Sequence, residues 1–284
     1  MENPIGIYEK ALPKDLSWAE RFKAARDCGY DFLELSVDET PERMARLDWS
    51  LAERLAFFRA SRESEVPVPS MCLSGHRKIP FGSADPAIRA QAAQFMAKAI
   101  QFASDTGIRV IQLAGYDVYY EPTTRESRER YYEGMERALQ VAAQHQVTLA
   151  LEIMDTTFLN SISKYLVLKE RLPSPWFMVY PDLGNLTAWG NDVGAELRAG
   201  IDQIVGVHVK ETRPVGPGFP GAFRDIPFGE GSVDFVDCFR TLNDLRYAGP
   251  FLVEMWTEKA ADPIKEIALA RQWVGERLHQ GGYA

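Results

Sequence analysis

The stretch TLALEIMD, residues 148–155, is an apolar run with a single carboxylate, Glu152, in the middle of it. Short and nearly continuous apolar runs are typical of strands in a parallel sheet that is buried on both faces. An ionised glutamate inside such a strand costs several kcal/mol unless a partner compensates its charge. The stretch therefore predicts a buried strand and, at its end, something that neutralises Glu152.

Similar apolar runs recur along the chain, and each is followed by a longer segment with helical periodicity or helix-start residues. Together with residues 148–154, the runs cover residues 4–8, 31–36, 68–74, 109–115, 177–182, 204–210 and 250–256. Capping-box spacing is shown by Ser17 with Glu20, Ser50 with Glu53 and Thr123 with Glu126, and Asp85 and Asp262 each precede a proline. These signals place a helix after most of the strands.

Eight such βα units in 284 residues favour an α/β fold of the (β/α)₈ TIM-barrel type. A doubly wound sheet ranks second, because no GxGxxG turn follows the first strand. We expect a single domain over residues 1–284, with a long Gly- and Pro-rich loop at 211–232 after strand seven. That loop would lie at the carboxyl face of the barrel, where barrels of this type place their function.

The composition narrows the class of partner. A net charge of −8 and a pI near 5.2 argue against a nucleic-acid partner, because binding to a phosphate backbone depends on clustered Lys and Arg. No apolar run approaches the length of a membrane helix, and the N-terminal residues carry charges where a signal peptide has its apolar core. Three cysteines without CxxC spacing are typical of reduced thiols. We therefore expect a soluble cytoplasmic protein without a membrane partner.

Polar side chains occur at the ends of four consecutive predicted strands. Glu152, Asp182, His208 and Glu254 belong to strands five to eight, and the carboxyl ends of barrel strands meet at one mouth. Each of them alone could be a strand-end residue paired with a neighbour, but three clustered carboxylates with one imidazole would repel one another. A divalent cation would neutralise them. The mixed oxygen and nitrogen ligands favour Mn²⁺ or Zn²⁺, with Mg²⁺ or Co²⁺ as alternatives.

Further polar residues are placed to line the same mouth. We predict substrate contacts for His76 after strand three, Lys210 two residues beyond His208, Tyr8 at the end of strand one and Asn185 after Asp182. For His76 the alternative is a residue that stabilises its own loop, and for Lys210 an exposed strand-end lysine. The stretch NSISK, residues 160–164, could bind a phosphate at a helix N-terminus, or its serine could be an ordinary helix cap.

A metal flanked by two glutamates suits proton abstraction from a carbon next to a carbonyl group. One carboxylate would remove the proton to give an enediolate, and the other would return a proton. Return to the opposite face of the same carbon is epimerisation, whereas return to the adjacent carbon is aldose–ketose isomerisation. Glu152 and Glu254 come from non-adjacent strands, so they could lie on opposite sides of a ketose, which favours an epimerase.

At this level of detail the sequence resembles the L-ribulose-5-phosphate 3-epimerases, also called L-xylulose-5-phosphate 3-epimerases, of the xylose isomerase-like TIM barrel superfamily. The resemblance runs from about residue 4 to 275 and depends on the motifs GIYEKALP, ELSVDETPERMARLDWS, SMCLSGHRKIPFGS, IRVIQLAGYDVYY, EIMDT, NSISK, PDLGNLTAW, VHVKET, PFGEGSVDF and VEMW. It implies a metal held by Glu152, Asp182, His208 and Glu254. It also implies that Glu152 and Glu254 epimerise a small phosphorylated sugar, a ketopentose 5-phosphate, at C3 in L-ascorbate utilisation.

Two features depart from the family pattern. The stretch RPVGPGFPGAFRD after VHVKET is longer than in close relatives, which leaves open whether Arg213 or Arg224 contacts the phosphate. Epimerases of unphosphorylated ketoses have a further Glu where this chain has Phe158, which weakens a free-sugar function. An aldose–ketose isomerase and a free-ketose epimerase remain alternatives, and an endonuclease IV-like enzyme or a non-catalytic sugar-binding barrel is less favoured. We also expect a homodimer or larger homo-oligomer, a state that no motif specifies.

Overall fold

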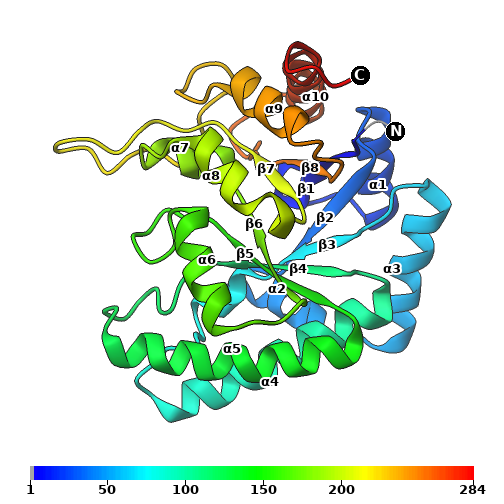
Figure 1. Ribbon diagram of the computed structural model, residues 1–284. Helices are drawn as coiled ribbons and strands as arrows, with labels where there is room; N and C mark the ends of the chain where they lie inside the picture. The colour runs from blue at the N-terminus through cyan, green and yellow to red at the C-terminus, as the bar shows by residue number, and fades with distance from the viewer. Residues whose placement is uncertain (1–2) are drawn as a thin grey trace.

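The computed structural model describes residues 3–284, in which eight parallel strands form one sheet that curls into a nearly closed barrel surrounded by helices (Figure 1). The predicted (β/α)₈ fold is therefore confirmed. The strands are β1 Ile5–Tyr8, β2 Phe32–Ser36, β3 Ser70–Cys72, β4 Val110–Ala114, β5 Thr148–Glu152, β6 Phe177–Tyr180, β7 Val207–Val209 and β8 Phe251–Val253. Each lies within one of the eight predicted apolar runs, and several are shorter than the run.

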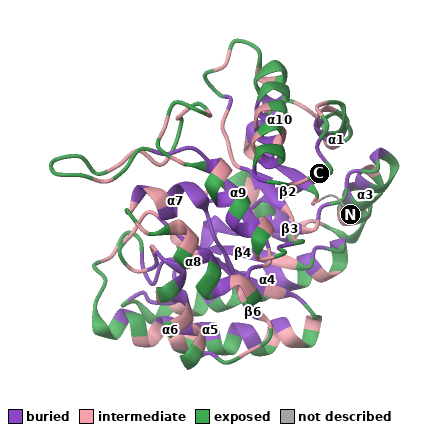
Figure 2. Ribbon diagram, turned by 45° about the horizontal axis from the view of Figure 1, so that its top comes forward, coloured by how far each residue is buried: buried purple, intermediate pink, exposed green. Residues whose placement is uncertain are grey.

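The helices connect successive strands and cover the outside of the barrel. They are α1 Trp18–Asp27, α2 Pro41–Met44, α3 Leu51–Ser64, α4 Pro86–Thr106, α5 Arg125–His145, α6 Ile162–Arg171, α7 Leu183–Ala188, α8 Val193–Gly200, α9 Phe235–Asp244 and α10 Pro263–Gln280, with 3₁₀ turns at Glu9–Ala11, Ala45–Asp48, Ser74–Arg77 and Ile201–Gln203. Figure 2 shows that their buried residues face the sheet, whereas their exposed residues face outward. Among the helices of residues 3–284, none has both the length and the apolar character needed to cross a bilayer.

The helix starts mostly follow the predicted capping residues. Ser17 and Ser50 form complete capping boxes at the starts of α1 and α3, and Asp85 and Asp262 cap α4 and α10. The prediction for α5 was wrong by one residue, because its cap is Thr124 with Ser127 and not Thr123 with Glu126. The Thr123 hydroxyl instead donates a hydrogen bond to Asp117 Oδ1 at 2.9 Å, which leaves its neighbour to cap the helix.

The barrel closes unevenly around its circumference. Seven neighbouring strand pairs form regular ladders, in the order β6-β5-β4-β3-β2-β1-β8-β7. Within residues 3–284, β6 and β7 are joined by two isolated parallel bridges, Val179 with Ile204 and Asp182 with His208. The second bridge lies beyond the end of β6, and there the His208 N–H donates to the carbonyl oxygen of Pro181 at 2.9 Å. The join between β6 and β7 is therefore the least bonded part of the sheet.

The long segment between β7 and α9 has a hairpin at its centre. Antiparallel bridges pair Arg213 with Ala222 and Gly216 with Phe219, and the hairpin extends away from the barrel as the yellow loop of Figure 1. After the hairpin the chain returns to the mouth, where Phe223 and Arg224 line a cavity. The predicted loop at 211–232 thus lies at the carboxyl ends of the strands, but its tip projects away from the barrel instead of folding over it.

Candidate metal and active site

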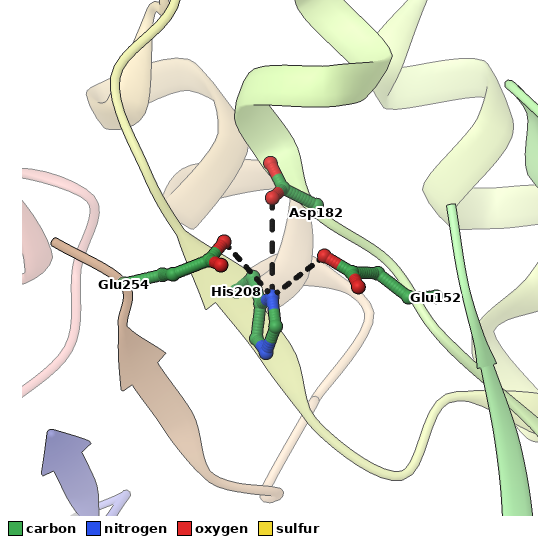
Figure 3. A group of neighbouring side chains, drawn as sticks. All are labelled: Glu152, Asp182, His208 and Glu254. Carbon is green, nitrogen blue, oxygen red and sulfur yellow. Dashed lines mark hydrogen bonds and ion pairs between the residues drawn. The ribbon is translucent and has the colours of Figure 1, made fainter. Parts of the chain in front are cut away.

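Four side chains from the carboxyl ends of β5 to β8 converge on one point (Figure 3). Glu152 ends β5, Asp182 precedes α7, His208 lies within β7 and Glu254 directly follows β8. One ligand atom from each lies within 4.8 Å of those of the others. From Nδ1 of His208 the distances are 3.1 Å to Glu152, 3.4 Å to Glu254 and 3.8 Å to Asp182. The structure therefore brings together the four residues that the strand-end pattern singled out.

Asp182 is oriented by its place at the start of a helix. Its Oδ1 caps α7 by accepting the N–H of Asn185 at 2.8 Å, which leaves Oδ2 to face the other three side chains. Gly184 allows the close packing of α7 against the segment after β7. A Cβ at that position would lie 2.5 Å from the carbonyl oxygen of Lys210 and 2.7 Å from Thr212 Cγ2, closer than atoms can approach. A glycine in the first turn thus keeps Asp182 beside His208.

Lys210 neutralises part of the cluster's negative charge. Its Nζ lies 2.7 Å from Asp182 Oδ2 and 3.1 Å from Glu254 Oε2. Burial disfavours the lysine charge, but these two carboxylates outweigh burial and raise the pKa of Lys210. Neither carboxylate oxygen accepts a hydrogen bond of normal geometry within the described residues. Two buried oxygens with a nearby charge and no directional bond are suitable ligands for a metal ion.

The two glutamates have opposite pKa shifts. Burial raises the pKa of Glu152, and the nearby His208 opposes that shift only in part. Burial acts on Glu254 in the same direction, but Lys210 and His208 outweigh it and lower the pKa of Glu254. For His208 itself burial favours the neutral ring, whereas the surrounding carboxylates, chiefly Glu152, raise its pKa. The carboxylates around His208 and Lys210 thus favour the charged forms of both side chains.

Two further side chains hold the cluster in place, and neither was predicted. Oε1 of the fully buried Glu34 lies 3.6 Å from Nε2 of His208, and its Oε2 accepts a hydrogen bond from the Ser70 hydroxyl at 2.6 Å. The side-chain amide of Gln112 donates to Oε2 of Glu152. Glu34 had the same sequence signal as Glu152, because it also interrupts an apolar run, DFLELS. A buried second carboxylate on a metal-binding histidine is a common way to orient its ring.

The cluster lies at the base of a cavity of about 540 Å³ at the mouth of the barrel. Three of the predicted substrate contacts, Tyr8, Asn185 and Lys210, line this cavity. The Tyr8 hydroxyl is hydrogen bonded to the Ser36 hydroxyl at 3.0 Å. The Asn185 amide donates to the carbonyl oxygen of Ile153 at 2.7 Å, while its Oδ1 is buried without a partner in residues 3–284. Cavity and cluster together form a compartment that could hold a small polar molecule.

His76 does not line the cavity. Its Nδ1 and Nε2 lie 2.6 Å and 3.1 Å from the backbone carbonyl oxygens of Leu73 and Ala114, and burial lowers its pKa. These contacts correspond to the alternative role, a residue that stabilises its own loop, and the substrate contact of His76 stays a prediction. The His76 ring connects the loop after β3 to the end of β4. Sequence spacing alone could not distinguish this structural role from a ligand contact.

Of the candidate phosphate-binding residues, only Arg224 lines the cavity. At the start of α6 the Ser161 hydroxyl accepts the N–H of Lys164, and Ser163 donates both its N–H and its hydroxyl to Glu196. A helix start that already holds a carboxylate is an ordinary cap, and residues 160–164 do not line the cavity. Arg224 lines the cavity with its guanidinium 4.2 Å from the Trp256 ring. Arg213 and Phe158 do not line it; Arg213 lies in the exposed hairpin and the Phe158 ring packs 5.5 Å from the Tyr131 ring.

The donor set fits a divalent cation. Three carboxylates and one imidazole nitrogen provide the mixed oxygen and nitrogen ligands that Mn²⁺, Zn²⁺, Co²⁺ and Mg²⁺ accept in proteins. Gln112 and Glu34 supply outer contacts to two of the ligands, as is usual around bound metals. The cation would add its positive charge to that of Lys210 beside Asp182 and Glu254.

Comparisons with known proteins agree with this architecture. Residues 22–276 match the family model described as xylose isomerase-like TIM barrel. The chain is 58% identical over 279 residues to SgbU of Escherichia coli (strain K12), covering 98% of both chains. It is 56% identical over 98% of its length to L-ribulose-5-phosphate 3-epimerase UlaE of Escherichia coli (strain SE11), of which it covers 96%. Among solved structures, an L-ribulose 3-epimerase superposes with a TM-score of 0.81 at 20% identity, over 98% of this chain and 95% of that one.

Proposed function

The chain belongs to the xylose isomerase-like TIM barrel family, and from that membership we propose that it is a metal-dependent sugar-phosphate 3-epimerase. The proposed reaction interconverts L-ribulose 5-phosphate and L-xylulose 5-phosphate. The observation that carries the proposal is the convergence of Glu152, Asp182, His208 and Glu254 in a chain 56% identical to an L-ribulose-5-phosphate 3-epimerase. Relatives at this identity and coverage are enzymes of the isomerase class, and so is this chain.

The four clustered residues would hold one divalent cation, Mn²⁺ or Zn²⁺ being favoured by the mixed ligands. When bound, such a cation supplies positive charge that stabilises the oxyanion formed as the carbon next to a carbonyl loses its proton. Glu152 and Glu254 extend from strands five and eight, which are not neighbours in the barrel. In the proposed mechanism one of these carboxylates removes the proton at C3, and the other delivers a proton to the opposite face.

Other residues would orient the two glutamates and the sugar. The Gln112 amide fixes one oxygen of Glu152, so that the other oxygen faces the cluster. Tyr8, Asn185 and Lys210 line the cavity and offer a hydroxyl, an unpartnered amide oxygen and an ammonium to sugar oxygens. The apolar neighbours of Glu152, from Leu149 to Ile153, are fully buried and keep water out of the base of the site.

Two alternatives use the same cluster. An aldose–ketose isomerase would move the proton to the adjacent carbon, and an epimerase of an unphosphorylated ketose would need no phosphate contact. An endonuclease IV-like activity is less favoured, because the cluster contains a single histidine and the chain has a net charge of −8. A non-catalytic sugar-binding barrel would not require two carboxylates around one cation.

Proton exchange at C3 tests the proposal directly. The metal-loaded protein is incubated with L-ribulose 5-phosphate or L-xylulose 5-phosphate in D₂O, and NMR follows deuterium at C3 together with the ratio of the two sugars. We expect deuterium at C3 in both sugars and a common equilibrium ratio. Label at C1 with an aldose product would indicate an isomerase instead. Absence of exchange with either sugar, in protein with confirmed metal content, would refute the proposal.

Variants of the two glutamates assign their roles. Glu152→Gln and Glu254→Gln should each abolish epimerisation, since each removes one of the two proton-transfer groups. Glu20→Gln is the matched control, because Glu20 is an exposed residue of the α1 capping box. Retention of full turnover by both site variants would exclude the two-glutamate mechanism.

A further inference from the structure

Four cationic side chains line the cavity above the cluster, and three of them are paired with carboxylates. Lys10 lies 2.6 Å from Asp38, and Lys210 is bound to the cluster as described. Arg224 has Asp225 and Glu258 each at 3.7 Å. The fourth is Arg77, for which the described residues 3–284 provide neither a salt bridge within 4.0 Å nor a hydrogen bond. Glu39 lines the same cavity and acts on the Arg77 charge without a direct contact, so Arg77 is the cation here whose N–H groups are not taken up by a carboxylate of residues 3–284.

Aromatic rings hold Arg77 in place. Its guanidinium carbon lies 4.8 Å from the ring centre of Tyr119 and 5.3 Å from that of Tyr116. The Tyr116 hydroxyl donates to Asp155 Oδ1 at 2.5 Å, which fixes that ring. Cation–π contacts stabilise the charge through the face of the guanidinium and leave its N–H groups free. The Nε atom is buried without a partner, so the group is oriented yet has unused donors.

We propose that Arg77 recognises the phosphate group of the substrate. The inference builds on the proposed function, because it assigns a residue to the 5-phosphate of a ketopentose 5-phosphate. A planar guanidinium with free N–H groups matches a phosphate dianion, which it can bind with two parallel hydrogen bonds. Arg77 lies on the loop after β3 and lines the same cavity as Glu152, which ends β5, and Glu254, which follows β8. A sugar between them can present C3 to the glutamates and its phosphate to Arg77.

The same contact would select against sugars without a phosphate. A bound free ketose would leave the oriented guanidinium without an anion, whereas a phosphorylated one would provide it with charge-assisted hydrogen bonds. Arg224 is less suited to this role, because its side chain is more than half exposed and its charge is shared between Asp225 and Glu258. Arg77 is therefore the main determinant of phosphate recognition in this cavity.

The test compares a sugar with and without its phosphate. Arg77→Met keeps the length and packing of the side chain and removes its charge, and Arg77→Lys keeps the charge but removes the planar fork. Arg59→Met is the matched control, because Arg59 is exposed on α3 and does not line the cavity. For each protein, kcat and KM are measured with L-ribulose 5-phosphate and with L-ribulose. Calorimetric titration of the metal-free protein with L-ribulose 5-phosphate measures binding without turnover.

We expect Arg77→Met to raise KM for L-ribulose 5-phosphate and lower kcat/KM by about 10- to 100-fold, as for the loss of a charge-assisted hydrogen bond. Values for L-ribulose should change by less than about threefold, and Arg77→Lys should recover part of the loss. Arg59→Met should match the wild type with both sugars. Calorimetry should show the same loss of affinity in Arg77→Met, with folding checked by circular dichroism.

Other outcomes separate the two proposals. Equal losses for both sugars, or no loss for either, with an active wild type would overturn the assignment of Arg77 and leave the epimerase intact. A wild type that epimerises neither sugar would refute the proposed function. In that case calorimetry still decides the role of Arg77, because binding of L-ribulose 5-phosphate that is equal in wild type and Arg77→Met would refute it.

Discussion

Nε2 of His208 lies 3.6 Å from Oε1 of the buried Glu34, while Nδ1 of the same ring faces Glu152, Asp182 and Glu254. A carboxylate behind the ring favours a proton on Nε2 and leaves the Nδ1 lone pair for a metal ion. Glu34 is in turn held by the Ser70 hydroxyl. The interior of the barrel, and not its mouth, thus orients the single imidazole ligand.

Glu34→Gln should weaken metal binding by about 10- to 100-fold, because the neutral amide keeps the size of the side chain but loses the charge that orients His208. Calorimetric titration of the metal-free protein with Mn²⁺ or Zn²⁺ measures the affinity. Glu53→Gln, at the exposed capping box of α3, is the control and should bind metal as the wild type does. Unchanged affinity in a folded Glu34→Gln protein would exclude this role.

Lys210→Met should destabilise the metal-free protein by about 3–5 kcal/mol, because it leaves Asp182 and Glu254 without their closest buried countercharge. Adding the divalent cation should reverse most of that loss, since the metal replaces the missing charge and binds only the folded state. Denaturant unfolding with EDTA and with Mn²⁺ measures both effects. Lys23→Met, from the exposed pair with Asp27, should lose less than about 1 kcal/mol and show no metal-dependent recovery. Equal loss with and without metal would contradict the compensation.

Glu9→Gln should flatten the acid side of the stability curve. Burial would raise the pKa of Glu9, but hydrogen bonds and ion pairs from Arg46, and charge from Arg43, outweigh it and lower that pKa. A lowered pKa in the folded state means that the stabilisation is complete above the ordinary value near 4.5 and is lost as pH falls below it. Unfolding free energies at pH 7 and pH 4 should therefore differ more in the wild type than in Glu9→Gln.

The same variant should lose about 3–5 kcal/mol at pH 7, because Arg21 and Arg46 remain buried without their shared carboxylate. Glu20→Gln, at an exposed cap, is the control for both measurements. A variant with the wild-type pH dependence would show that another acid controls acid unfolding.

Gly184→Ala should cost about 1–3 kcal/mol and weaken metal binding, because the added methyl group pushes the start of α7 away from the chain after β7. That shift would move Asp182 relative to His208. Gly194→Ala is a matched change in the first turn of α8, where the nearest atom to a new Cβ is the flexible end of Arg198 at 3.1 Å. The control should keep wild-type stability and metal affinity, and equal behaviour of the two variants would contradict the packing argument.

The sequence predicted the barrel because each strand is buried on both faces, so that its composition reveals it without knowledge of its neighbours. It overestimated several strand lengths for the same reason. The predicted run at 250–256 extends past Val253 to Met255 and Trp256, yet only Phe251–Val253 pairs with neighbouring strands. The residues after that point form the mouth, where Glu254 and Trp256 line the cavity.

The convergence of Glu152, Asp182, His208 and Glu254 was predictable because a polar residue at each of four strand ends is a pattern along the chain. The contacts of His76 and Arg77 were not predictable, because both lie in the turn after β3. The direction of their side chains there depends on the end of β4 and on the Tyr116 and Tyr119 rings. These two adjacent residues differ in their contacts: the His76 ring lies against backbone carbonyl groups, whereas the Arg77 side chain lines the cavity. Glu34 has a sequence signal of its own, because a carboxylate that interrupts an apolar run, as Glu152 also does, indicates a buried charge with a partner.

Asp182 and His208 form the bridge that completes the weakly bonded join between β6 and β7. An ion bound by both side chains would cross-link β6 and β7. The proposed catalytic cation would then also stabilise the closure of the barrel. Removal of the ion by a chelator would then increase local opening between β6 and β7 before it affects the other strand pairs. Amide hydrogen exchange at residues 204–210 should therefore report metal occupancy, while exchange in β1 and β2, on well-bonded ladders, should not.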